Sequence, residues 1–295
     1  HIPIKLYIST IKAKTSKRIT EIPSVAIKTP RVNDPNYSIE PTASCLSSLT
    51  KESFRGLADL EELHLDNNRV SLKPYLFSEL KKLKALYLSF NRIDHLPKHA
   101  FDGLPYLKWL FLRYNRLTSV EEDTFVELTD LLQFLRLDNN RIDKIVPGSF
   151  EKLHELTHLH LEYNLVSKIL PGTFRGLKAL TALFLDYNSL TNIVKGDFDE
   201  LDSLQMLNLQ FNEIANIEPG SFENLFSLRK LNLRRNKLTH ITVGVFDKLP
   251  KLYDLDLSYN FIGIVDPGAF NSGNIESFRN GNFSLISWIE DLWIF

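Results

Sequence analysis

The 295-residue sequence contains a single cysteine, Cys45. One cysteine excludes an internal disulfide framework, a Cys-x-x-Cys redox centre and a metal site built from cysteine alone. Cys45 is expected near the surface, because the same slot in the complete repeats described below mostly holds solvent-compatible residues. It is either a partly covered free thiol or one half of a disulfide to another chain.

Excess charge and long apolar runs are also missing. Lysine and arginine number 35 and aspartate and glutamate 36, so the net charge is −1. We expect no nucleic-acid partner, because no overall basic excess exists to bind a phosphate backbone. We expect no membrane span, because no apolar run approaches the ~20 residues that one requires. The first residue is His1 rather than Met, as expected of a processed or trimmed chain.

Signatures of catalysis are equally scarce. The sequence has no Gly-x-Ser-x-Gly, P-loop or His-Glu-x-x-His motif. Two histidine pairs, His158 with His160 and His95 with His99, could share a face or flank a loop. Neither pair has an obvious carboxylate-rich pocket, although Glu162 is near the first. We therefore expect no enzyme, no metal site and no cofactor.

What the sequence does contain is a repeat. The pattern Leu-x-x-Leu-x-Leu-x-x-Asn-x-(Leu/Ile/Val) occurs first at residues 60–70 and returns eight times. Its asparagines follow one another at 23 to 25 residues: Asn68, Asn91, Asn115, Asn140, Asn164, Asn188, Asn212, Asn236 and Asn260. A phenylalanine keeps the same period from Phe54 to Phe270. Nine copies at one period exclude chance and predict a solenoid.

The chemistry of the repeat agrees with this interpretation. Alternation in Leu-x-Leu predicts a short strand whose leucines point inward, and one strand per repeat stacks in parallel on the next. The asparagine lies where the chain leaves the strand, so its amide can pair backbone groups that leave the ladder. The phenylalanines are expected to form a second internal stack beneath the convex side.

The 24-residue, phenylalanine-bearing repeat resembles the "typical" leucine-rich repeats of Toll-type receptors, Slit, chondroadherin and small leucine-rich proteoglycans. The resemblance covers residues 36 to about 270. It implies an α/β solenoid, the leucine-rich repeat horseshoe, with parallel strands on the concave face and irregular or 3-10 segments on the convex face. It also implies a secreted, extracellular protein. Two Asn-x-Ser sequons, at Asn36 and Asn282, are candidate glycosylation sites.

The repeat frame divides the chain into three parts. Residues 1–35 are expected to be an N-terminal capping segment, 36–270 the solenoid with one degraded and nine regular repeats, and 271–295 a C-terminal cap. The segment to Arg31 carries seven lysines and arginines against one acid, Glu21, and forms either a solvated cap or a contact for a sulfated glycan or acidic partner. The apolar tail is either a lid on the last repeat or a partner-binding segment.

Side chains that the repeat does not dictate carry the functional information. In this frame the strand residues outside the leucine slots face the concave side. Aromatic residues gather there in the second to fourth repeats, acids align in the fourth to sixth (Asp138, Glu162 and Asp186), and the eighth repeat is basic. The predicted binding residues are Tyr87, Phe90, Trp109, Phe111, Tyr114, Phe134, Arg136, His160, Phe184 and Arg234. Aromatics in the slot directly before the asparagine could instead form a purely structural ladder.

Nine strands at ~4.8 Å span roughly 40 Å, which suits a protein rather than a metabolite. Exposed Trp, Tyr, Phe and Arg are the residue types of interface hot spots. The sequence therefore predicts a secreted, non-enzymatic recognition scaffold that binds a protein through its concave face. Two alternatives stay open: a non-catalytic subunit that stabilises a secreted enzyme, and an extracellular-matrix protein that binds collagen or a glycosaminoglycan.

Overall fold

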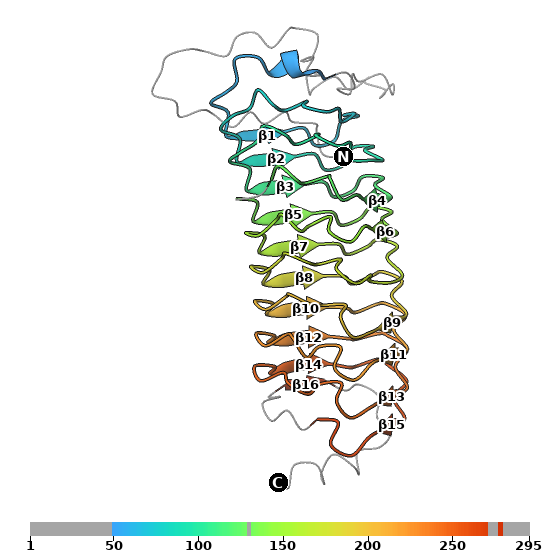
Figure 1. Cartoon of the computed structure of the whole chain (residues 1–295). Helices are drawn as coiled ribbons and strands as arrows, with labels where there is room; N and C mark the ends of the chain where they lie inside the picture. Colours follow the sequence, from blue (N-terminus) through green and yellow to red (C-terminus); the bar gives the residue numbers. More distant parts are fainter. Residues whose placement is uncertain (1–48, 129–130, 271–276, 280–295) are drawn as a thin grey trace, which may run out of the picture.

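The computed structural model of the chain describes residues 49–128, 131–270 and 277–279. Ten three-residue strands form one parallel sheet that runs the length of a solenoid (Figure 1). In order they are β1 (Glu62–His64), β2 (Ala85–Tyr87), β3 (Trp109–Phe111), β5 (Phe134–Arg136), β7 (His158–His160), β8 (Ala182–Phe184), β10 (Met206–Asn208), β12 (Lys230–Asn232), β14 (Asp254–Asp256) and β16 (Ser277–Arg279). The predicted leucine-rich repeat solenoid is confirmed.

The strands pair without any slip between repeats. Leu63 is in register with Leu86, Leu110 with Leu135, and Leu231 with Leu255. In the nine strands of this sheet from β1 to β14, the middle residue is a buried leucine, while the third residue is half-buried in most of them. Sequence slots thus become columns of side chains along the sheet. β16 lengthens the sheet by one strand beyond residue 270, within the segment expected to be a cap.

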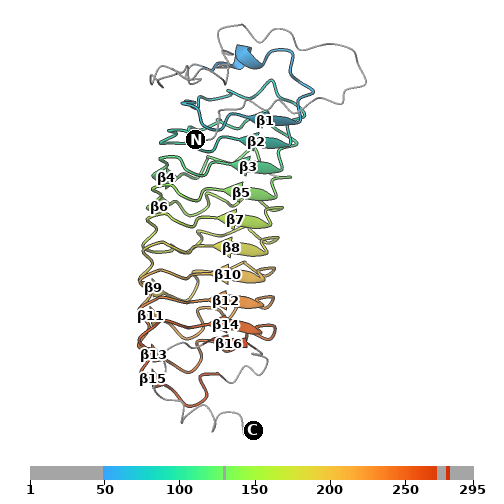
Figure 2. The ribbon, with the colours of Figure 1, turned by 180° about the vertical axis from the view of Figure 1, so that it is seen from behind.

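The side opposite the sheet is mostly irregular, as the resemblance implies. A 3-10 helix, η1 (Lys51–Phe54), precedes the first strand. Three short parallel pairs lie opposite the sheet (Figure 2), and the sequence did not predict them: β4 (Ser119–Val120) with β6 (Lys144–Ile145), β9 (Asn192–Ile193) with β11 (Asn216–Ile217), and β13 (His240–Ile241) with β15 (Ile264–Val265). A two-residue strand is too short to show an alternating pattern. No helix within the described residues is long and apolar enough to cross a membrane.

A phenylalanine stack fills the interior behind the sheet, as predicted. The rings of neighbouring repeats lie 5.7 to 6.3 Å apart between centroids. Their contacts form three runs: Phe54 and Phe77, Phe101 to Phe150, and Phe174 to Phe270. Rings from Phe77 to Phe246 are almost completely buried. The stack therefore ties each repeat to its neighbours on the side that the strands leave open.

The asparagine ladder, formed by the asparagines of the repeat pattern, ties the repeats together where each strand ends. Asn164 donates from Nδ2 to the carbonyl of Leu161 in its own repeat and to that of Leu137 in the preceding repeat, both at 3.0 Å. Its Oδ1 accepts from the backbone N–H of Ile142 at 2.9 Å. Asn91 and Asn212 make the same three bonds. Each amide thus gives one buried N–H its acceptor and adds a donor to two carbonyls that neighbouring asparagines share, since Leu137 also accepts from Asn140 and Leu161 also accepts from Asn188.

Asn164→Ala should lower the free energy of unfolding by roughly 2–4 kcal/mol, because the buried N–H of Ile142 loses its acceptor and the carbonyls of Leu137 and Leu161 each lose one of two donors. The neighbouring Leu165 is 52% exposed, so Leu165→Ala should change stability by less than about 0.5 kcal/mol. Urea unfolding followed by circular dichroism measures both. Equal stability of wild type and Asn164→Ala would contradict the role given to the ladder.

Candidate functional site

A continuous row of rings follows the concave face, because the third residues of neighbouring strands lie in register. His64 stacks on Tyr87 with ring centroids 4.0 Å apart, Tyr87 on Phe111 at 4.6 Å, and His160 on Phe184 at 4.4 Å. We call the row formed by His64, Tyr87, Phe111, Phe134, His160 and Phe184 the central stack. It joins five of the predicted binding residues, and it begins one repeat earlier than the predicted set, at His64.

Within the central stack, Phe134 bridges the one strand, β5, whose third residue carries no ring. It is the first residue of β5, whereas the third residue is Arg136. Its ring lies 5.8 Å from that of Phe111 and 5.1 Å from that of His160. The stack therefore stays continuous across β5, although the column of central residues in the sequence is interrupted by an arginine.

The central stack covers much of its own surface. Its members are half-buried, since each ring shields the face of the next. Trp109, the first residue of β3, stays 38% exposed, and it is the one exposed aromatic among the strand residues whose burial is described. Within the strands, the aromatic area open to a partner is thus smaller than the sequence suggested and is concentrated around Trp109 and the rims of the stacked rings.

Phe90 and Tyr114 lie apart from the central stack, at the turn that follows each strand. Their rings stack at 4.4 Å, and both side chains are exposed, by 49% and 40%. A second run in the same slot joins Tyr163, Tyr187 and Phe211 at 4.1 and 4.2 Å. The backbone here has φ between +51° and +56°, a left-handed conformation that disfavours bulky side chains. The predicted set is thus divided between a central stack and an edge row.

Arg136 holds together a polar network on the same face. Its Nε donates to Oδ1 of Asp138 at 2.8 Å, and its Nη2 donates to Oε1 of Glu162 at 3.3 Å. The Nε of Arg113 lies 3.3 Å from the other oxygen of Asp138. The ring nitrogen Nδ1 of His160 lies 3.0 Å from Glu162. Arg136 and His160 are therefore already paired within the chain.

The row of acids that the sequence places on the readable surface is largely buried, which corrects that expectation. The side chain of Asp138 has no exposed area, and Asp186 is 7% exposed. Neighbouring side chains cover these carboxylates. Arg113 and Arg136 fold over Asp138, and the amide of Asn208 donates to Asp186 at 2.9 Å. The repeat frame predicts the direction in which a side chain points, but it does not predict which neighbouring side chains cover it.

Asp186 is the titratable group of this face with the largest perturbation. Burial and the nearby charge of Glu162 raise its pKa from 3.8 to about 6. Burial, and then the neighbouring His160, lower the pKa of His158. Both shifts arise because the concave face withdraws charged groups from water.

The histidine pairs considered as metal ligands have other partners. His95 contacts Asp94 at 2.6 Å, and His99 contacts Asp102 at 2.7 Å. His158 contacts the hydroxyl of Thr157 at 2.9 Å, and His160 contacts Glu162. Across residues 49–128, 131–270 and 277–279 no group of three or more His, Cys, Asp or Glu residues is arranged to hold a metal ion.

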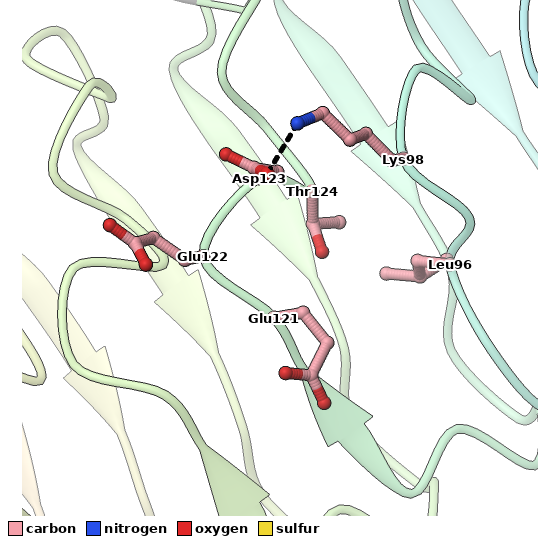
Figure 3. A pocket seen from close by; sticks show the side chains of 6 residues that line it. All are labelled: Leu96, Lys98, Glu121, Glu122, Asp123 and Thr124. Atoms are coloured by element: carbon pink, nitrogen blue, oxygen red, sulfur yellow. Dashed lines mark hydrogen bonds and ion pairs between the residues drawn. The ribbon is translucent and has the colours of Figure 1, made fainter.

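A surface hollow away from the sheet was not predicted. It is lined by Leu96, Lys98, Glu121, Glu122, Asp123 and Thr124 (Figure 3). Lys98 turns into it and donates to Asp123 at 2.6 Å, while the carboxylates of Glu121 and Glu122 point in different directions. Because these groups do not converge on one point, the hollow offers no defined ligand geometry.

Arg234 lies two residues after the end of β12, which β14 and β16 follow in the sheet, and its guanidinium sits 4.2 Å from the ring centre of Tyr259. It is separated from the central stack by β10, so it marks a third surface. Asn36, Asn282, Cys45 and the basic N-terminal segment lie outside the described residues. The roles expected for these residues therefore stay predictions from the sequence.

The raised pKa of Asp186 predicts a pH-dependent stability. The folded state holds its proton up to about pH 6 and the unfolded state only to about 3.8, so the wild type loses stability as pH rises through this window. Asp186→Asn keeps an acceptor for Asn208 and removes the titration. Its stability relative to wild type should rise by about 1–3 kcal/mol between pH 3.5 and pH 7. A constant difference, measured by urea unfolding at both pH values, would contradict the assignment.

Comparison with known proteins places this geometry in a family. The family model described as "Leucine rich repeat" matches residues 42–93, 81–133, 130–190, 155–214, 180–238, 202–262 and 226–274. Rat osteomodulin (Rattus norvegicus) is 33% identical over 97 residues, which cover 32% of this chain and 22% of the relative. The chain thus spans about a fifth of that protein's length.

Two solved structures share the fold. One is a TLR13–ssRNA13 complex, with a TM-score of 0.67, 28% identity and coverage of 72% of this chain and 31% of the other. The second is an octameric complex of Latrophilin 3, Unc5D and the repeat domain of FLRT2, with a TM-score of 0.63, 25% identity and coverage of 79% of both chains. Since the family model matches most of the sequence, the chain belongs to the leucine-rich repeat family.

Proposed function

We propose that this chain is a secreted, non-enzymatic recognition scaffold that binds a protein partner through its concave face, with Trp109 and the central stack at the middle of the contact. The observation that carries the proposal is the exposed indole of Trp109 beside a continuous row of half-buried rings. A rigid aromatic surface of this kind loses little side-chain entropy when a partner covers it.

The solenoid interior does not require these rings. The leucines, the phenylalanine stack and the asparagine ladder already fill and pair the core, whereas the strand residues of the concave face point away from it. Alanine occupies the same slot as Trp109 in β2 and β8. Since alanine is enough for the fold at this position, the large indole of Trp109 is not needed for folding, and this supports a role in binding.

The relatives support a protein as partner. The FLRT2 repeat domain was solved in an assembly with Latrophilin 3 and Unc5D, which are proteins. The TLR13 structure is a complex with ssRNA13, but this chain has a net charge of −1 and so lacks the basic excess that binds a phosphate backbone. The similarity to osteomodulin and to other extracellular repeats supports secretion.

Capture of the partner from native material with the full chain, followed by mass spectrometry, comes first. Against that partner, Trp109→Ala should weaken binding by about thirtyfold, equivalent to at least about 2 kcal/mol, while the melting temperature changes little. Lys152→Ala is the matched control, because Lys152 is exposed and lies outside the concave strands; it should leave affinity unchanged. Wild-type affinity of Trp109→Ala, measured by biolayer interferometry, would move the site elsewhere.

A further inference from the structure

Two arginines follow β12 and place their guanidinium groups over aromatic rings. Arg235 takes the left-handed position after the strand, with φ +53°, and its guanidinium is 5.2 Å from the ring centre of Phe211 and 4.6 Å from that of Tyr259. The guanidinium of Arg234 lies 4.2 Å from the same Tyr259 ring. We call Arg234 and Arg235 the arginine pair. Tyr259 serves both members as a platform.

The arginine pair differs from the other arginines of the concave face in what neutralises it. Arg113 and Arg136 contact Asp138 and Glu162. No carboxylate within the described residues lies within 4.0 Å of Arg234 or Arg235, whose contacts are the rings and, for Arg234, the hydroxyl of Ser258 at 3.3 Å. On the adjacent strand, Asp256 accepts from the hydroxyl and the backbone N–H of Ser258, so its contact with Arg234 runs through that hydroxyl and is not a direct ion pair.

Stacking on a ring fixes the position of a guanidinium and leaves its N–H donors available for hydrogen bonds. The cation lies against the π-face, while the five N–H donors project in its own plane. Such a planar fork matches the two oxygens of a carboxylate, and holding it in place beforehand reduces the entropy lost on binding. The side chain of Arg235 is exposed, so its donors are open to a ligand.

We propose that the arginine pair is an anion site that receives a carboxylate from an acidic segment of the bound protein. This rests on the proposed function in one respect, that the segment belongs to the partner on the concave face. β12 is two strands beyond β8, which carries the end of the central stack, so about 10 Å separates the two surfaces and one partner can contact both.

An acidic protein segment fits better than a sulfated glycan chain. A glycan polyanion needs a run of cations, but the strand beside β12 carries Asp254 and Asp256, and β10 carries Met206 and Asn208. The positive charge is thus confined to one repeat, which suits one or two carboxylates of a flexible acidic peptide, whose other glutamates can stay in solvent away from Asp254 and Asp256.

The test measures fluorescence anisotropy of a fluorescein-labelled hexaglutamate peptide at low salt, with hexaglutamine as the uncharged probe. The full-length wild type should bind hexaglutamate and not hexaglutamine. Arg235→Gln should weaken binding about tenfold, as for loss of a charge-assisted bidentate contact. Lys237→Gln removes one charge from the same repeat, but Lys237 already pairs with Glu213; its affinity should stay within about twofold of wild type.

A second variant separates the effect of holding the two guanidinium groups in place from the effect of their charge. Tyr259→Asn removes the ring, and the backbone accepts it, because Asn67 and Asn139 occupy the same left-handed slot in other repeats. Its net charge is that of wild type, yet its affinity for hexaglutamate should fall by about three- to fivefold because the guanidinium groups are no longer held. Melting temperatures of all variants confirm that they are folded.

Four results would overturn the proposal: unchanged binding by Arg235→Gln, an equal loss in Lys237→Gln, unchanged binding by Tyr259→Asn, or tight binding of a heparin hexasaccharide together with none of hexaglutamate. The last result would assign the pair to a sulfated glycan instead. Trp109→Ala should bind hexaglutamate like wild type. The peptide assay therefore tests the anion site alone. The binding of the captured partner by Trp109→Ala tests the proposed function alone.

Discussion

The hydrogen bonds of the buried asparagine are the interaction on which the rest of this structure depends. A three-residue strand has to end abruptly so that the chain can turn away from the sheet, and the turn leaves backbone groups inside the solenoid without partners. Asn164 pairs two of these carbonyls, one from each of two successive repeats, and one N–H. Because the same amide bonds to adjacent repeats, it fixes their spacing and register as well as closing the turn.

Fixed register has a direct consequence for the surface. Equivalent side chains of successive repeats are held one strand apart, so planar groups in the same slot stack. The same geometry produces the buried phenylalanine stack, the central stack and the edge row with its arginine pair. Ring stacking by itself therefore does not mark a binding site. Exposure distinguishes Trp109 from the other aromatic residues within strands β1 to β14, and the absence of a carboxylate contact within the described residues distinguishes Arg234 and Arg235 from Arg113 and Arg136.

The repeat frame could be predicted from the sequence because Leu, Asn and Phe each serve a role that few other residues can serve in that slot. Contacts between unlike slots could not be predicted. Phe134 fills the gap left by Arg136 from a neighbouring column, and Asp138 is buried because two arginines from different repeats close over it. The two-residue strands opposite the sheet and the pairing of β16 likewise depend on tertiary neighbours rather than on local pattern.

The central claim, that a protein covers the aromatic part of the concave face, is tested most directly by hydroxyl-radical footprinting of the chain with and without its captured partner. Trp109 is 38% exposed, while Tyr106 at 52% and Phe261 at 72% lie outside the strands and serve as internal references. The account predicts that the partner lowers oxidation of Trp109 several-fold and leaves Tyr106 and Phe261 unchanged. Unchanged oxidation of Trp109 together with protection of Tyr106 or Phe261 would contradict it.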